Sequence, residues 1–440
     1  MSRNVAIIGG GPRSLWAVEE LIDRARAELT VTVFDPHPAG AGAVYRPDQP
    51  TCWRLNVSSS IVRSSVETFG EWCTHRGIPA EEFPPRAVVG QFLADAWAAA
   101  VHRSPANLQL RHLPRLVHAV HQDADGRYQV IVSGEPESAA EIAQARFDEV
   151  LVCTGHAHDH PTALHHRPSA VPVTGLYFGA DLPTSPRRIG TRGAALSFID
   201  VCLRYPEAET IYPVSRSGRF MEVKPPLPEF PSYLHAAART AGSAAEVRKV
   251  LIDAALTLGD FAAAQLHHVL DGEDFTGDAV AEFHHSLRVA RGDAPLHAAG
   301  AIGVAFRGLF NNFVDHHAHD GVIPGFAELA RTLERVSFGP PPITAQVLAD
   351  ALDSGQVDTT YLARPETIDE WMGGSTGPAP DIDLLIDATI APQGRPTPFS
   401  DVPGVVEIGR RNEKILPGHD SLSRDNHTDI PRWAEKVGKP

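Results

Sequence analysis

A short apolar run, three consecutive glycines and an amphipathic stretch open the chain, and together they restrict its fold more than any other feature. Val5–Ile8 predicts a strand, and Gly9–Gly11 predicts a tight turn. From Leu15 to Ile22 apolar residues recur at helical spacing, and a second strand is predicted at Leu29–Phe34, stopped by Asp35 and the proline after it. This order predicts a Rossmann-like βαβ unit.

The glycine turn predicts contacts to the pyrophosphate of a dinucleotide. Gly9 permits the tight turn, and Gly11 lets the backbone approach a phosphate at the positive end of the following helix. Ser14 replaces the third glycine of the fingerprint, is still small, and adds a hydroxyl. Asp35 lies about 20 residues further on, where a carboxylate accepts hydrogen bonds from a ribose diol. The alternative is a turn without a ligand and a solvated Asp35.

Two later apolar segments predict further strands of the same domain. Glu149–Cys153 predicts a buried strand that runs into Thr154 and Gly155, as expected where a chain passes a bound pyrophosphate. Residues 381–389 repeat this pattern near the C-terminus and predict a second such passage.

A second nucleotide-binding turn is predicted near residue 190. Residues 190–197, with Gly190 at their start, lead into a predicted helix at 194–203 and a strand at Thr210–Val214. The lead-in at 185–189 is polar where a buried strand is expected, so a degenerate unit that only packs is the alternative. Ser215 and Arg216 follow the strand, where the 2′-phosphate of NADPH would lie. No acid occupies this strand end, which favours NADPH over NADH.

These features resemble the bacterial FAD/NAD(P)-binding flavoproteins that have two dinucleotide-binding domains and begin with Gly-Gly-Gly-Pro-Arg. Residues 9–13 carry that motif, and Leu55–Val57, Pro85-Arg86 and Gly90 match further segments of the group. The resemblance implies that FAD contacts several residues: Gly9, Gly11, Pro12, Arg13, Ser14, Asp35, Asn56 near the flavin, a backbone group at Val117 or His118 near the adenine, Thr154 and Gly155. A loop residue that satisfies its own turn is the alternative for Asn56.

Some members of this group resemble N-hydroxylating monooxygenases of amino acids and amines, which use FAD, NADPH and dioxygen. The resemblance therefore implies an FAD-dependent oxidoreductase, an NADPH-dependent flavin monooxygenase that hydroxylates a small amine or amino acid. Two alternatives are a flavin-dependent dehydrogenase or reductase without oxygen activation, and a non-catalytic FAD-binding protein. No residue is assigned a catalytic role.

The predicted fold class is α/β, a Rossmann-like FAD domain with a smaller NAD(P)-like domain and a helical insertion. We expect residues 1–185 and 376–440 to form the FAD domain, 186–225 the NAD(P)-binding-like unit, and 226–375 a helical insertion or substrate domain. Specificity for the substrate is expected to come from the helical segment. The sequence does not indicate an oligomeric state.

Composition excludes several classes of function. The net charge of −15 argues against nucleic-acid binding. No apolar run approaches the roughly 20 residues that span a bilayer, and the first run is too short for a signal peptide, so we expect a cytoplasmic protein. The four cysteines form no Cys-x-x-Cys pair. Histidine-rich segments at 156–160 and 315–320 are interpreted as solvated loops rather than metal sites, and for His156 we favour a structural hydrogen bond over proton exchange at the flavin.

Overall fold

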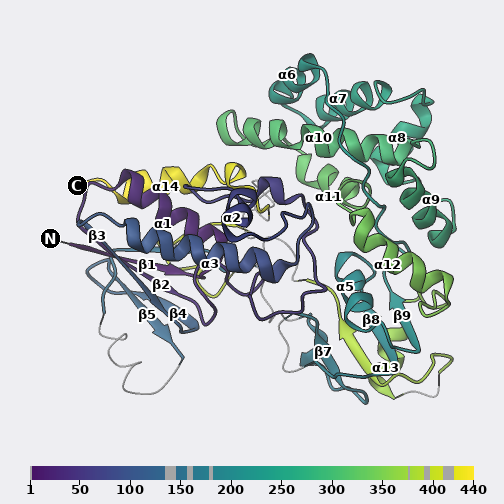
Figure 1. The fold of residues 1–440 in the computed structure, drawn as a ribbon, viewed down its shortest axis with the longest axis horizontal. Coiled ribbons are helices and arrows are strands. Elements are labelled where there is room, and N and C mark those ends of the chain that lie inside the picture. The colour runs from purple at the N-terminus through teal and green to yellow at the C-terminus, as the bar shows by residue number, and fades with distance from the viewer. Residues whose placement is uncertain are drawn as a thin grey trace. The chain divides into compact units, whose positions relative to one another are not determined.

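The computed structural model describes residues 2–133, 145–155, 162–177, 182–374, 377–390, 397–409 and 421–440 (Figure 1). The chain forms two compact units. Unit 1 comprises residues 1–157 and 392–440, and unit 2 comprises residues 158–391. The division therefore falls at 157 and 392, where the sequence predicts boundaries at 185 and 376.

Unit 1 is built on a five-stranded parallel sheet in the order β11-β6-β1-β2-β3. The strands are β1 (Arg3–Ile8), β2 (Leu29–Phe34), β3 (Leu108–Leu113), β6 (Glu149–Val152) and β11 (Val406–Glu407). The first strand lies at the centre and the chain then moves to both sides, which is the strand order of a Rossmann sheet. Strand β3 was not predicted, because its polar residues hide the apolar pattern of a half-exposed edge strand.

Helices cover one face of this sheet, and a β-hairpin covers the other (Figure 1). The helices are α1 (Pro12–Arg24), α2 (Phe69–Arg76), α3 (Arg86–Arg103) and α14 (Asp429–Val437), with 3₁₀ turns at Ser59–Ile61 and Arg424–Asn426. The hairpin consists of β4 (Val117–Gln122) and β5 (Tyr128–Val132). Of the predicted apolar face of α1, Leu15, Val18 and Leu21 are fully buried and Ile22 is partly buried against the same core.

Buried ion pairs fasten the C-terminal segment to α1. The guanidinium of Arg424 binds Glu19 (Nη1–Oε2, 2.5 Å) and Glu20 (Nη2–Oε1, 2.7 Å). Glu19 is fully buried, and burial raises the pKa of its carboxyl even though the charge of Arg424 opposes this. Removing one partner of such a buried pair typically costs about 3–5 kcal/mol, so these pairs hold residues more than 400 positions apart in one unit.

Unit 2 contains a second parallel sheet in the order β7-β10-β8-β9. Its strands are β7 (Val173–Gly175), β8 (Arg188–Arg192), β9 (Thr210–Val214) and β10 (Leu384–Asp387), and α5 (Leu196–Arg204) connects β8 to β9. This corrects the assignment of residues 381–389 to the FAD sheet, because β10 pairs with β7 and β8. A short buried apolar run carries no information about which sheet it joins.

The segment predicted to be helical is helical. It contains α6 (Ser232–Thr240), α7 (Ala244–Leu256), α8 (Ala263–Asp271), α9 (Ala279–Arg291), α10 (Ala298–His319), α11 (Phe326–Ser337), α12 (Pro342–Asp353) and α13 (Thr367–Gly373). Helix α10 supplies much of a separate core, in which Phe306, Phe313 and Phe326 are fully buried.

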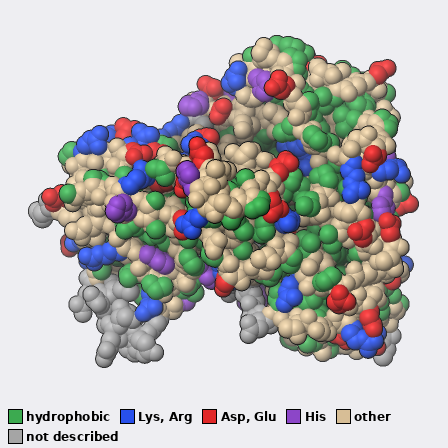
Figure 2. Space-filling view, viewed as in Figure 1, with side chains coloured by type: hydrophobic (Ala, Val, Ile, Leu, Met, Phe, Trp, Pro, Cys, Tyr) green, Lys and Arg blue, Asp and Glu red, His purple; other side chains and the backbone are tan. Residues whose placement is uncertain are grey.

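The surface carries charges of both signs. On the face drawn in Figure 2, acidic and basic side chains are interspersed rather than gathered into one basic stripe. Within the described residues, no helix is both long enough and apolar enough to cross a membrane.

Candidate functional site

The turn between β1 and α1 requires glycine at two of its three positions. Gly9 has a φ of +99°, and a Cβ on it would lie 2.6 Å from the carbonyl oxygen of Cys153. A Cβ on Gly10 would lie 2.7 Å from the Cβ of Asp35. By contrast, no described atom lies within 4 Å of a Cβ built on Gly11. The turn is therefore packed tightly on its inner side and open at Gly11.

The open side coincides with the N-terminus of α1. Gly11 is the N-cap and Pro12 the first helical residue; within the described part of the chain no side chain caps this end, and the first turn carries no acid. The hydroxyl of Ser14 is buried and donates to the carbonyl of Gly11 at 2.7 Å, so it closes the turn from inside. The helix dipole makes this open end suitable for an anion.

The carboxylate of Asp35 stabilises the same turn. Its Oδ2 accepts a hydrogen bond from the amide of Gly10 at 2.6 Å, and its Oδ1 accepts one from the amide of His37 at 2.8 Å. The side chain is buried, which makes these charge-assisted bonds strong. A contact with a ribose diol stays a prediction, and it would use the remaining lone pairs of the same carboxylate.

A glycine-rich loop lies directly against the turn. The amide of Gly40 donates to the carbonyl of Gly10 at 2.7 Å. Gly42 has a φ of +60°, and a Cβ on it would lie 2.7 Å from the Cα of Gly11. The sequence predicts an ordered loop over residues 40–65. The structure adds that Gly40 and Gly42 of this loop pack against the glycine turn.

Arg13 lies beside the ends of two strands of the unit 1 sheet. A Cβ on Gly155, just after β6, would lie 4.0 Å from its Nη1. A Cβ on Gly409, just after β11, would lie 3.0 Å from its Nε. Gly409 has a φ of +103° and was missed by the sequence reasoning, which assigned this second passage to residues 381–389. The sequence signal for this passage is the short, mostly apolar run Val405–Ile408, which is followed by a glycine, as the strand before Thr154 and Gly155 is.

In unit 2, the glycine that makes the turn is not the one that was predicted. Gly190 lies inside β8, where a Cβ would meet the ring of Trp371 at 2.7 Å and Ile382 at 2.8 Å. The turn is made by Gly193, with a φ of +117° and an amide that donates to the carbonyl of Val214 at 2.8 Å. This corrects the prediction, which placed the strand too early because its first residues are polar.

An arginine–aspartate pair stabilises the end of β8. The guanidinium of Arg192 contacts Asp387 at the end of β10 (Nε–Oδ1, 2.9 Å), and the amide of Leu164 donates to Oδ2 of that aspartate at 3.0 Å. Asp387 therefore joins the ends of β8 and β10, whereas Asp35 in unit 1 binds the amide of the glycine turn. Among the described residues, no side chain caps the N-terminus of α5 and no acid lies in its first turn.

Ser215 and Arg216 follow β9, as predicted. Ser215 holds its own turn, because its Oγ accepts from the amide of Gly218 at 3.1 Å and its amide donates to Leu362 at 2.8 Å. Arg216 is exposed. Its side chain makes no hydrogen bond or ion pair to any residue that the structure describes.

Comparison with known proteins identifies the first of these two regions. Residues 6–157 match the model of a protein family described as FAD-NAD(P)-binding. This segment is an FAD/NAD(P)-binding domain. It contains β1, the glycine turn, Asp35 and the end of β6, so the predicted dinucleotide-binding role of the N-terminal segment is confirmed.

Two curated relatives are similar to this chain over only part of their own length. Nitrosuccinic acid synthase npaA of Aspergillus oryzae is 33% identical over 152 residues, which cover 30% of this chain and 23% of that protein. The L-aspartate N-monooxygenase (nitrosuccinate-forming) of Streptomyces cremeus is 27% identical over 253 residues, which cover 44% of this chain and 36% of that protein. The match thus spans about a quarter to a third of each relative.

The overall fold is that of a solved flavin enzyme. ε-Caprolactone-bound cyclohexanone monooxygenase is similar with a TM-score of 0.51 and 14% identity, over 99% of this chain and 87% of that one. The predicted fold class, a Rossmann-like FAD domain with a smaller NAD(P)-like domain and a helical insertion, is confirmed.

Three further predicted contacts of the FAD/NAD(P)-binding domain stay predictions. Asn56 is half-buried beside Leu55, whose amide donates to the carbonyl of Pro84 at 2.9 Å. His118 is exposed at an irregularity of the β4–β5 pairing, between the paired residues Val117 and Ala119. Thr154 is exposed at the end of β6, where a ligand can reach it.

The histidine-rich segments give no metal cluster in the described part of the chain. Residues 156–160, with His156, lie outside the described residues. In α10, the ring of His316 contacts the carbonyl of Arg239 (Nδ1–O, 2.9 Å), and the buried His317 accepts a hydrogen bond from the amide of Ile323 at 3.3 Å. The prediction of solvated histidines is therefore wrong for these two rings, which have structural contacts.

Two of the cysteines are inert by environment. Burial raises the pKa of the thiols of Cys153 and Cys202 to about 12. The thiolate is the reactive form, so both remain unreactive at neutral pH. Both are small buried residues of the core.

Proposed function

We propose that this chain is an NADPH-dependent flavin monooxygenase that N-hydroxylates a small amine or amino acid, with L-aspartate as the first substrate to test. The observation that carries the proposal is the similarity of part of this chain to two proteins named for nitrosuccinate formation. The two strand–turn–helix units support it, because such an enzyme needs one site for a flavin and one for its reductant.

The residues of unit 1 fit the pyrophosphate of FAD. Gly11 leaves open space at the amides of α1, and any side chain there would fill it. Arg13 adds a positive charge beside Gly155 and Gly409, and Asp35 fixes the turn from behind. When bound, FAD would supply the redox chemistry, by accepting a hydride and by reacting with dioxygen in its reduced form.

The residues of unit 2 fit a phosphorylated reductant. The open N-terminus of α5 suits the pyrophosphate of NADPH, and the exposed guanidinium of Arg216 suits its 2′-phosphate. Gly190 is not part of this proposed site, because it is buried in β8. Gly193 takes its place at the turn.

Each part of the chain then has a limited task. The glycine turn and Arg13 bind and orient the flavin, and the turn at Gly193 with Arg216 selects the reductant. Asp35 holds the first turn in the shape that accepts a phosphate, because its bond to the amide of Gly10 is buried. A ribose hydroxyl is the second partner that we propose for this carboxylate.

Three measurements on purified protein test the proposal. The absorbance spectrum should show the two bands of an oxidised flavin, and NADPH should bleach them without oxygen. In air, L-aspartate should then yield an N-oxygenated product detectable by mass spectrometry. Bleaching with only hydrogen peroxide released, across a panel of amines, would favour a reductase. A bound flavin that NADPH never bleaches would favour a non-catalytic FAD-binding protein.

A further inference from the structure

Unit 2 contains a cavity of about 510 Å³ within its helical part. Its walls come from the segment after β9, from α8 and α9, from the loop between these helices, and from the first turn of α10. The lining residues that matter here are Glu222, Phe275, Ala281, Glu282, His285 and His297. The size is typical of a small-molecule site.

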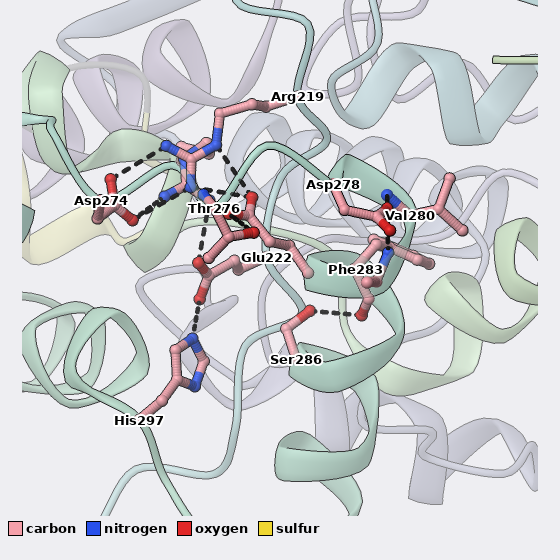
Figure 3. A network of polar contacts seen from close by, with 12 residues as sticks. Arg219, Glu222, Asp274, Thr276, Asp278, Val280, Phe283, Ser286 and His297 are labelled. Carbon is pink, nitrogen blue, oxygen red and sulfur yellow. Dashed lines mark hydrogen bonds and ion pairs between the residues drawn. The ribbon is translucent and has the colours of Figure 1, made fainter. Parts of the chain in front are cut away.

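A network of buried ion pairs forms one wall of this cavity (Figure 3). Arg219 binds Asp274 through two bonds of 3.0 and 3.2 Å and binds Glu282 at 3.0 Å. Arg335 binds Glu222 at 2.9 Å and Asp274 at 2.5 Å. All three carboxylate side chains are at most 13% exposed.

The charges of this network do not balance. Three carboxylates share two guanidiniums, and the third partner is the imidazole of His297, whose Nε2 lies 3.1 Å from Oε2 of Glu222. Burial acts to raise the pKa of Glu222 and of Asp274, but their hydrogen bonds and the charges of the arginines prevail and lower it. Those two carboxylates stay ionised. Counted at their formal charges, the three carboxylates, Glu282 included, outnumber the two guanidiniums by one, so the wall carries excess negative charge whenever His297 is neutral.

The lining of the cavity also includes apolar residues. Val269, Ala281, Ala298 and Ala299 contribute short aliphatic side chains. Phe275 is 44% exposed and adds an aromatic ring. The cavity therefore combines uncompensated negative charge with room for a hydrocarbon group.

We propose that this cavity binds the primary ammonium group of a small aliphatic amine, with its positive charge at Glu222 and its hydrocarbon part against α8 and α9. An ammonium ion carries three donors and one positive charge, and it supplies the cation that the network lacks. As an ammonium site the cavity stands on its own charges. As the site of the enzyme's substrate it rests on the proposed function, and it would favour a simple amine over L-aspartate, whose two carboxylates the negative wall repels.

Calorimetric titration of the FAD-loaded protein without NADPH tests the site. The probes are n-butylamine, L-norvaline, which is the same amine with an added carboxylate, and pentanoate, which has the carboxylate and no ammonium. We expect n-butylamine to bind and pentanoate not to bind. Binding of L-norvaline as well would identify the source of the ammonium as an amino acid, and its failure to bind would identify a simple amine. Equal binding of pentanoate and n-butylamine, or no binding of either ammonium compound, would overturn the proposal.

Two variants and a matched control locate the binding. Glu222→Gln should weaken the binding of n-butylamine by about 10- to 100-fold, which is the usual effect of losing a buried charged hydrogen bond. Glu273→Gln removes the same charge from the exposed rim of the cavity, 3.8 Å from His268, and should change binding by less than about twofold. Ala281→Phe fills the cavity from an exposed helix position outside the ion-pair network and should abolish binding even if Glu222→Gln does not fold.

The two proposals fail separately. If Ala281→Phe folds, as shown by an unchanged melting temperature, and still binds n-butylamine as tightly as the unaltered protein, the cavity is not the site. If the amine binds but NADPH never bleaches the flavin, the proposed function fails and the ammonium site stands. Loss of amine binding in a protein whose flavin NADPH still reduces would leave only the cavity proposal wrong.

Discussion

The two strand–turn–helix units of this chain share a topology and stabilise their turns differently. In unit 1, the turn after β1 has three glycines, and the carboxylate of Asp35 at the end of β2 binds the turn amide directly. In unit 2, the turn after β8 relies on Gly193, and the strand end is held by the Arg192–Asp387 pair. The amide of the first turn is thus held by a carboxylate side chain, whereas the amide of Gly193 in the second turn donates to the backbone carbonyl of Val214.

The corresponding position after each helix shows why the units differ. The strand after α1 ends in the buried Asp35, and the strand after α5 ends in Ser215 and the exposed Arg216. An acid at this position suits a free ribose diol and a guanidinium suits a 2′-phosphate. On the proposed function, the same backbone arrangement would serve two dinucleotides that are distinguished by one change of charge.

The largest effect is expected at the first turn. Gly9→Ala places a Cβ 2.6 Å from a backbone carbonyl at a φ of +99°, so the turn must deform and the protein should purify without flavin. The ratio of flavin to protein absorbance measures this. Gly11→Ala is the matched control: its Cβ meets no described atom, so its melting temperature should stay unchanged while FAD affinity falls. Equal flavin content in Gly9→Ala and the unaltered protein would contradict the role of the turn.

Arg216→Ala should affect only the second unit. Loss of a charge-assisted contact to phosphate is expected to raise the KM for NADPH about 10- to 100-fold and to leave the KM for NADH unchanged. Steady-state reduction of the bound flavin with each nucleotide gives both values. The flavin content should not change, because Arg216 lies in unit 2. A parallel rise in both KM values would show that the guanidinium does not distinguish the 2′-phosphate.

Two glycines of β8 and its turn should separate stability from binding. Gly190→Ala crowds Trp371 and Ile382 and should destabilise unit 2 by about 1–3 kcal/mol, with little change in the KM for NADPH. Gly193→Ala strains the turn at a φ of +117° and should raise that KM. Thermal unfolding and flavin reduction measure the two effects. An unchanged melting temperature for Gly190→Ala would show that Trp371 and Ile382 do not require glycine at this position.

The smallest effect is expected in the acid range. A carboxylate with a lowered pKa stabilises the fold above the ordinary value of about 4, and this contribution is lost as pH falls through the lowered value. The pKa values of Glu222 and Asp274 are lowered, so the melting temperature should fall below about pH 4. Glu222→Gln should show a shallower fall over that range. In unit 1, the raised pKa of Glu19 acts in the opposite direction, since its protonated form is favoured by burial.

The sequence alone determined the elements whose signals are local. Strand β2 and strand β9 have the predicted bounds, and the turn at Gly9–Gly11 lies where the glycines placed it. Each has a strong period or a backbone conformation that only glycine readily adopts. From them followed the α/β fold and the dinucleotide-binding role.

The tertiary structure decided which segments meet. Strand β10 joins the second sheet, Gly409 rather than residues 381–389 lies beside Arg13, and Gly193 rather than Gly190 makes the second turn. These outcomes depend on pairings between residues far apart in the chain, and short buried strands look alike in sequence. The ion-pair network around Glu222 is also assembled from distant segments, so its charge imbalance exists only once the chain has folded.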